Sequence, residues 1–279
     1  MGHVRYDAKA WDDYATSSFG ATRDALYKSV DRSAVFKGRG IHADLDPKNM
    51  KNMMRESRDG ANNPRSRAII LALDETGSMG DIPHFMVGSG LPKVFEEIEA
   101  RNPVSDPHIM VMGIGDVESD KAPIQMSQFE AGKDILPQLA NIFLEGNGGG
   151  NHYESYALAW YMAANHTSID CFEKRGEKGY LFTIGDEFPT PLLRADDIRK
   201  FVGTGPQEDL TSEQILDMAN RMYHVFHIIV GQGQAYRRRP DETRKRWSNL
   251  MGQNAIPLSD KSALSEVIVS TMQANKGLS

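Results

Sequence analysis

The chain has 279 residues, of which 40% are hydrophobic and 25% are charged, and its formal net charge is −6. This composition is typical of a globular protein and excludes a disordered or fibrous one. The negative net charge argues against nucleic acid as the main partner.

The cysteine content and the apolar stretches bear on the location of the protein. Because Cys171 is the only cysteine in the sequence, no disulfide can form within the chain, which fits a reducing compartment. The first residues lack the apolar core of a secretion signal, and no stretch approaches the roughly 20 apolar residues that span a bilayer. We therefore expect a cytoplasmic protein without a membrane partner.

Residues 1–66 differ from the rest of the chain. They are polar and mixed in charge, only residues 21–30 have a helical pattern, and a turn-forming cluster at 59–64 closes the segment. The segment has few large apolar side chains with which to build a core. We predict an N-terminal arm at 1–66 that lies on a main domain at 67–279.

The main domain alternates between predicted strands and predicted helices. Apolar runs typical of strands buried on both faces lie at 68–73, 108–114, 179–184 and 225–230, with an edge strand or hairpin at 125–129 and a short strand at 255–258. Helical patterns lie at 83–100, 133–143, 154–165, 212–223 and 261–274. This alternation predicts an α/β fold of the Rossmann-like, doubly wound type, in which a mostly parallel sheet has helices on both faces.

Oxygen-bearing side chains follow these strands, at the sheet edge where such folds bind ligands. Asp74, Thr76 and Ser78 come directly after the run at 68–73, and their alternation lets an extended loop point all three the same way. Asp186 follows the run at 179–184. A glycine-rich loop leads to Glu154, which we expect in the first turn of a helix. Hard oxygen ligands of this kind suit Mg²⁺ or Mn²⁺ better than zinc.

The spacing Asp74-x-Thr76-x-Ser78 resembles the Asp-x-Ser/Thr-x-Ser signature of the metal-ion-dependent adhesion site in von Willebrand factor A domains. The order of elements around it is also similar, and Asp186 matches the family's aspartate after the fourth main strand. Most members have a threonine at the position of Glu154. Integrin β-subunits and many bacterial members have a glutamate there, and this chain resembles them. The resemblance covers residues 67–279, and the sequence around these motifs is most similar to that of bacterial and phage members.

This resemblance implies a metal-dependent protein-binding module of the von Willebrand factor A fold. One Mg²⁺, or Mn²⁺ or Ca²⁺, would be held by Asp74, Thr76, Ser78, Glu154 and Asp186. One coordination position would stay open to an Asp or Glu of a protein partner. Intracellular relatives often work beside hexameric ATPases, so an AAA+ ATPase is the first partner to expect, with this chain as an adaptor or assembly factor. Asn151 either holds the metal ligands in place from outside the ligand set, or belongs to a neighbouring ion site, or caps the helix that follows it.

Other functions remain as alternatives. The chain could be a structural component of a phage particle or another assembly, with the metal mainly stabilising the fold. Nucleic acid handling through the arginines at 237–246 is a weaker alternative, because the acidic residues interleaved there favour a solvated helix. We predict no enzymatic activity: Thr76 stands where a serine hydrolase needs the first glycine of its nucleophile turn, and where a haloacid dehalogenase-type phosphotransferase needs a second aspartate.

Overall fold

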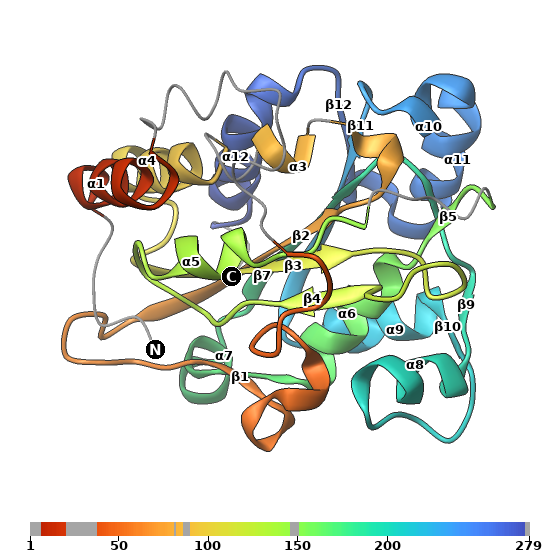
Figure 1. Ribbon diagram of the computed structural model, residues 1–279, viewed down its shortest axis with the longest axis horizontal. Coiled ribbons are helices and arrows are strands. Elements are labelled where there is room, and N and C mark those ends of the chain that lie inside the picture. Colours follow the sequence, from red (N-terminus) through yellow and green to blue (C-terminus); the bar gives the residue numbers. More distant parts are fainter. Residues whose placement is uncertain (1–6, 21–37, 81, 86–89, 146–150, 277–279) are drawn as a thin grey trace.

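A six-stranded sheet forms the centre of the protein (Figure 1). The structure, a computed structural model, describes residues 7–20, 38–80, 82–85, 90–145 and 151–276. The strand order is β12-β11-β7-β2-β3-β4, and every neighbouring pair is parallel except β3 and β4. The strands are β2 (Ser66–Asp74), β3 (Asp106–Ile114), β4 (Ile124–Met126), β7 (Gly179–Gly185), β11 (Tyr223–Val230) and β12 (Ala255–Leu258). The predicted doubly wound, mostly parallel sheet is confirmed.

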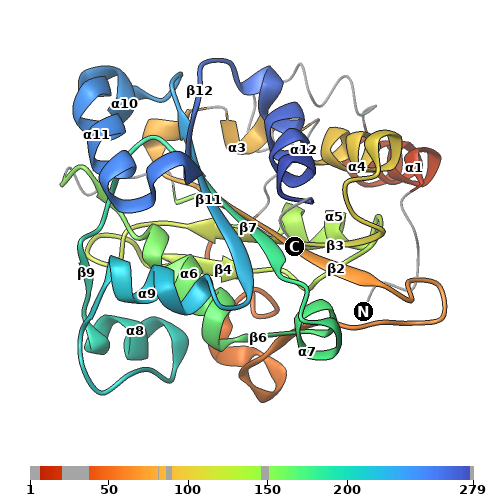
Figure 2. The same ribbon diagram turned by 180° about the vertical axis from the view of Figure 1, so that it is seen from behind.

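Helices cover both faces of this sheet (Figures 1 and 2). One face carries α1 (Ala8–Phe19), α3 (Ile82–Phe85), α4 (Leu91–Arg101), α5 (Ile135–Ala140) and α12 (Leu264–Asn275). The other carries α6 (Tyr156–Asn165), α7 (Asp170–Arg175), α8 (Ala195–Val202) and α9 (Ser212–Ala219). Two further helices, α10 (Gln234–Arg238) and α11 (Pro240–Met251), follow β11. Across the described ranges, no helix is long and apolar enough to cross a bilayer.

Short elements complete the fold. The two-stranded pairs are β1 (Arg55–Ser57) with β6 (Thr167–Ile169), β5 (Tyr153–Glu154) with β8 (Phe188–Pro189), and β9 (Leu192–Leu193) with β10 (Leu210–Thr211). The 3-10 turns are η2 (Pro47–Asn49), η3 (Lys51–Met53), η4 (Gly77–Met79), η6 (Gly252–Asn254) and η7 (Lys261–Ala263).

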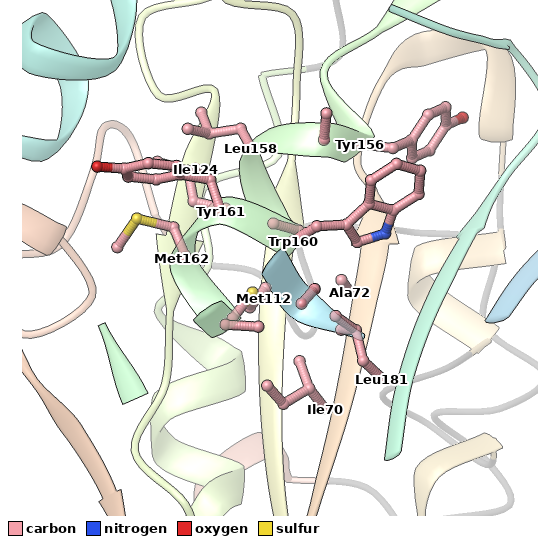
Figure 3. Close-up of a cluster of buried hydrophobic side chains, with 14 of the residues drawn as sticks. Ile70, Ala72, Met112, Ile124, Tyr156, Leu158, Trp160, Tyr161, Met162 and Leu181 are labelled. Carbon is pink, nitrogen blue, oxygen red and sulfur yellow. The ribbon is translucent and has the colours of Figure 1, made fainter. Parts of the chain in front are cut away.

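The side chains of β2 alternate between the two cores. Ile69 and Leu71 pack into the core under α4 and α12, whereas Ile70 and Ala72 pack into the core under α6. Figure 3 shows Ile70 and Ala72 in the same cluster of buried side chains as Trp160 of α6. Because both faces are covered, the strand is apolar from Ala68 to Leu73, just before it reaches the carboxyl edge of the sheet.

Several predicted helices differ in their bounds from the observed ones. The predicted helix at 154–165 begins only at Tyr156, and the one at 212–223 ends at Ala219 because the chain turns into β11. The predicted helix at 133–143 is reduced to α5, and the one at 261–274 divides into η7 and α12. The pattern at 83–100 contains α3 and α4, with 86–89 outside the described residues, as is the helical pattern at 21–30.

The described parts of residues 1–66 share the cores of the main sheet. Trp11 and Leu45 are buried in the core under α4, and Met50 in the core under α6. Arg58 Nη1 lies 2.9 Å from the buried Asp170 carboxylate of α7. The N-terminal segment is therefore held by apolar burial as well as by ion pairs, while the domain boundary at 66/67 stays a prediction.

Trp11→Ala should lower the free energy of unfolding by about 3–5 kcal/mol, the usual cost of truncating a buried tryptophan. Trp11 is 1% exposed, and its ring centroid lies 5.6 Å from that of Phe95 on α4. Chemical denaturation measures the loss, and Asp13→Ala, which changes an exposed residue of the same helix, is the control. Equal stabilities of the two variants would contradict the packing of α1 on this face.

Candidate metal centre

The candidate site lies at the carboxyl edge of the sheet, where β2 and β7 run side by side. Asp74 is the last residue of β2, and Asp186 comes directly after β7. After Asp74 the chain turns through η4, which begins after Thr76 and contains Ser78. Because the two strands are neighbouring and parallel, their ends bring both aspartates to one place.

Four of the predicted ligands form one continuous chain of hydrogen bonds. Thr76 Oγ1 donates to Asp74 Oδ1 at 2.6 Å, and the Thr76 and Ser78 hydroxyl oxygens are 3.2 Å apart. Ser78 Oγ donates to Asp186 Oδ1 at 2.6 Å. The structure thus brings Asp74, Thr76, Ser78 and Asp186 together.

Groups that the sequence did not indicate hold the outer oxygens of both aspartates. The Tyr156 hydroxyl of α6 donates to Asp74 Oδ2 at 2.8 Å, and the Ala235 backbone N–H of α10 donates to Asp186 Oδ2 at 2.8 Å. Tyr156 reaches the site across Gly185, where a Cβ atom would lie only 2.0 Å from its hydroxyl oxygen. Each aspartate is therefore fixed from two sides, and its inner oxygen faces the hydroxyls.

The electrostatics of the site favour a cation. Asp74 and Asp186 are both fully buried. Burial, together with the charge of Asp186, raises the pKa of Asp74 to about 8, and burial raises the pKa of Asp186 as well. Two buried carboxylates linked by hydroxyls cannot both ionise cheaply without a positive charge between them. A hard divalent ion supplies that charge and accepts carboxylate and hydroxyl oxygens, so the residues present fit Mg²⁺.

Glu154 occupies a different local position from the predicted one. It lies in β5, which pairs with β8, and Ser155 is the residue at the N-cap position, so Glu154 precedes the first turn of α6. Its side chain is buried, and among the described residues Glu154 Oε2 has no hydrogen-bond partner. Burial, followed by the charge of Asp74, raises the pKa of Glu154 well above its ordinary value. A buried carboxylate oxygen without a hydrogen-bond partner, close to Asp74, is consistent with an interaction between Glu154 and a bound cation.

Carboxylates alone do not form the candidate metal site. Among the described residues, no three His, Cys, Asp or Glu side chains lie close enough together to hold a metal by themselves. Direct ligation by Glu154, next to Asp74 and Asp186, therefore stays a prediction. The hydroxyls of Thr76 and Ser78 supply the inner oxygens that the geometry does show.

Asn151 does not cap the helix. It also makes no contact with the oxygen chain, the hydrogen-bonded series Asp74–Thr76–Ser78–Asp186. Its Nδ2 donates to Asp116 Oδ2 at 2.8 Å, and its Oδ1 accepts from the Tyr153 backbone N–H. Ser155 holds the capping position of α6. Asn151 thus ties the loop before β5 to the turn that follows β3. The glycines at 146–150 lie outside the described residues.

Tyr156→Phe should weaken Mg²⁺ binding by roughly tenfold, because groups that orient a metal ligand typically contribute that much to affinity. The change removes only the hydroxyl that donates to Asp74. Tyr161→Phe, the same change on the same helix, is the matched control and should leave the affinity unchanged. Calorimetric titration of both variants decides between them, and equal affinities would mean that Tyr156 does not position the aspartate.

Neither a protein-family model nor a curated protein matches the sequence. Solved structures do match it. The pilus adhesin SpaC from Lactobacillus rhamnosus GG, in its open conformation, is 9% identical with a TM-score of 0.51, over 78% of this chain and 31% of the adhesin. At this identity the similarity shows the fold alone.

Two further structures match less closely in shape. A von Willebrand factor type A protein from Catenulispora acidiphila is 15% identical with a TM-score of 0.41, over 76% of this chain and 43% of that one. Proximal thread matrix protein 1 from the mussel byssus, with a zinc-occupied MIDAS motif, is 12% identical with a TM-score of 0.43, over 75% and 47%. This chain therefore spans less than half the length of each of the three proteins.

Proposed function

We propose that this chain, which has the von Willebrand factor A fold, is a divalent-metal-dependent protein-binding module. The observation that carries the proposal is the hydrogen-bonded chain Asp74–Thr76–Ser78–Asp186 at the carboxyl edge of the sheet. The ion would be Mg²⁺, with Mn²⁺ or Ca²⁺ as the alternatives.

The chemistry of the site explains why a partner carboxylate would bind there. Asp74 and Asp186 supply the negative charge, and the hydroxyls of Thr76 and Ser78 are neutral. An ion held in this way keeps part of its preference for anionic oxygen, and its bound water can be exchanged for an Asp or Glu of a partner. Because Asp74 is fully buried, the low local dielectric strengthens that contact.

The role in the cell is part of the proposal. An adaptor or assembly factor needs a reversible contact whose strength depends on one exposed acidic side chain, and this site offers that chemistry. A partner of the AAA+ ATPase class is consistent with it. We also propose that the site is not catalytic, because Thr76 stands where a serine hydrolase needs a glycine and where a haloacid dehalogenase-type phosphotransferase needs a second aspartate.

Water relaxation on the Mn²⁺-loaded protein tests the open coordination position. Bound Mn²⁺ with exchangeable water strongly relaxes the solvent protons, and acetyl-Gly-Glu-Gly-amide should lower that relaxivity by displacing the water. Acetyl-Gly-Gln-Gly-amide is the matched control and should have no effect. Saturable Mn²⁺ binding with no response to the glutamate peptide would contradict the proposal and favour the alternative of a metal that only stabilises an assembly protein.

A further inference from the structure

The two flanks of the metal centre carry opposite charge. In the sheet order, β11 lies beyond β7 on one side of the aspartates, and β3 lies on the other side of β2. The chain that leaves β11 forms α10, with arginines at 237 and 238, whereas the chain that leaves β3 carries Asp116 and Glu118. A partner that lies across this edge therefore meets cations on one flank and carboxylates on the other.

Helix α10 is seated directly against the metal centre. Ala235 N–H donates to Asp186 Oδ2, and a Cβ atom at Gly233 would lie 2.1 Å from the same oxygen. Helix α10 also contacts η4, which carries Ser78. Arg238 follows Ala235 by three residues, about 4.5 Å along the helix axis, so both lie on the same side of α10.

The charge of Arg238 reaches the acidic residue beside the metal ligands. Burial, then the charges of Asp186 and Asp116, raise the pKa of Glu187 to about 7, and Arg238 acts in the opposite direction. Arg237 and Arg238 are both exposed, and neither has an ion pair within the part of the chain that the structure describes. Their guanidinium groups are thus available to an anion from outside.

The other arginines of this segment are already paired. Arg239 lies 3.7 Å from Glu242, Arg244 lies 2.6 Å from Asp241, and Arg246 lies 2.7 Å from Glu242. These interleaved carboxylates confirm the solvated character expected for α11 and disfavour a polyphosphate backbone along it. Within the described residues, they leave Arg237 and Arg238 as the arginines of this segment without such a counterion.

A second anchor keeps α10 and α11 in place. Trp247 of α11 donates its Nε1–H to the Glu187 carbonyl oxygen at 2.9 Å, and its ring stacks on His227 with centroids 3.3 Å apart. The arginines therefore stand on a scaffold fixed to the metal centre at both ends. Such preorganisation favours binding, because less ordering is needed when the partner arrives.

The opposite flank is unsuited to an acidic partner. Asp116, Glu118, Asp197 and Arg194 line a cavity of about 490 Å³, and Arg194 already lies 3.0 Å from Asp197. An anionic segment would be repelled there and attracted over α10.

We propose that the partner segment carries several carboxylates, of which one binds the metal ion and another binds Arg238 on α10, while Arg237 on the adjoining face of the helix adds positive charge. This inference rests on the proposed function and adds the class of partner: an acidic peptide segment that runs from the metal centre over α10. The metal supplies the contact that needs a carboxylate, and the arginines make a cluster of carboxylates bind more tightly than a single one.

The test uses fluorescence anisotropy of two labelled peptides on the Mn²⁺-loaded full chain, one with a single glutamate among Gly and Ser residues and one with four consecutive glutamates. The double substitution Arg237→Gln/Arg238→Gln should lower the affinity for the four-glutamate peptide by roughly tenfold, as expected for the loss of two exposed ion pairs. The single-glutamate peptide and Mn²⁺ itself should bind unchanged. Arg65→Gln/Lys178→Gln, with the same change of charge just before β2 and β7 at the opposite edge of the sheet, is the control and should leave binding of both peptides unchanged.

The outcomes separate the two proposals. If the arginine variant binds the four-glutamate peptide as tightly as the wild type, the inference is wrong and the metal-dependent function stands. If Mn²⁺ binds but the single-glutamate peptide does not, the proposed function is wrong. If the four-glutamate peptide binds equally well in EDTA, or if a thymidine oligonucleotide binds more tightly than it does, the inference is also overturned, since it requires metal and carboxylate together.

Discussion

Asp74→Ala should weaken Mg²⁺ and Mn²⁺ binding by more than about 100-fold while the chain stays folded. Removing a group that only orients a ligand usually costs up to about that factor, and Asp74 would itself be a ligand. The residue lies at the end of the central strand and accepts hydrogen bonds from Thr76 and Tyr156. Its loss leaves those hydroxyls without an acceptor but also removes repulsion between two buried carboxylates, so the fold should tolerate it.

Isothermal titration with each ion measures this effect, and circular dichroism verifies the fold. Glu187→Gln is the control, because it removes a neighbouring carboxylate that is outside the oxygen chain, and its affinity should stay within a few-fold. A folded Asp74→Ala protein with wild-type Mn²⁺ affinity would refute the site. Glu154→Ala should cost less than Asp74→Ala, and an equal loss would make Glu154 a direct ligand.

The metal-free protein should become less stable as the pH rises from 5 to 8. Burial and the charge of Asp186 raise the pKa of Asp74 from 3.8 to about 8 in the folded state. A carboxyl group with a raised folded pKa contributes stability below the unfolded pKa and loses it as the pH rises through the folded pKa. At about 1.4 kcal/mol per pKa unit, the loss over this range is about 4 kcal/mol.

Mg²⁺ should reverse most of this loss, because it binds the ionised carboxylates and displaces their protons. Thermal unfolding in EDTA and in saturating Mg²⁺, at pH 5 and at pH 8, measures both effects. The increase in Tm caused by Mg²⁺ should be larger at pH 8. Asp74→Asn removes one of the buried carboxyl groups whose pKa is raised and should make the pH dependence in EDTA smaller, while Asp186, Glu154 and Glu187 still contribute to it. A wild-type Tm in EDTA that does not change with pH would contradict the electrostatic account of the site.

The strands and the oxygen chain could be predicted from the sequence because both depend on local order. Each main strand is an apolar run, and Asp74 and Asp186 are placed by following such runs to their ends. Thr76 and Ser78 belong to the same loop as Asp74, so their positions follow from alternation along an extended chain. Parallel pairing then brings the two loops together without further information.

The remaining contacts depend on long-range packing that no local pattern reports. Tyr156 is 82 positions from Asp74 in the sequence. Its side chain points toward Asp74 because α6 packs over Gly185. Ala235 acts through its backbone N–H, which carries no sequence signal. Glu154 was placed in the helix because its residue type suits a first turn, but pairing of β5 with β8 overrides that preference.

The stack of Trp247 on His227 gives the protein an intrinsic optical probe of the metal centre. The indole also lies edge-on to Tyr156, with ring centroids 5.3 Å apart, and Tyr156 holds Asp74. Asp74 is therefore linked to the chromophore Trp247 through one intervening side chain, that of Tyr156. Emission on selective excitation of tryptophan should respond to ion occupancy without any attached dye, and replacing Trp247 with Phe should remove that response.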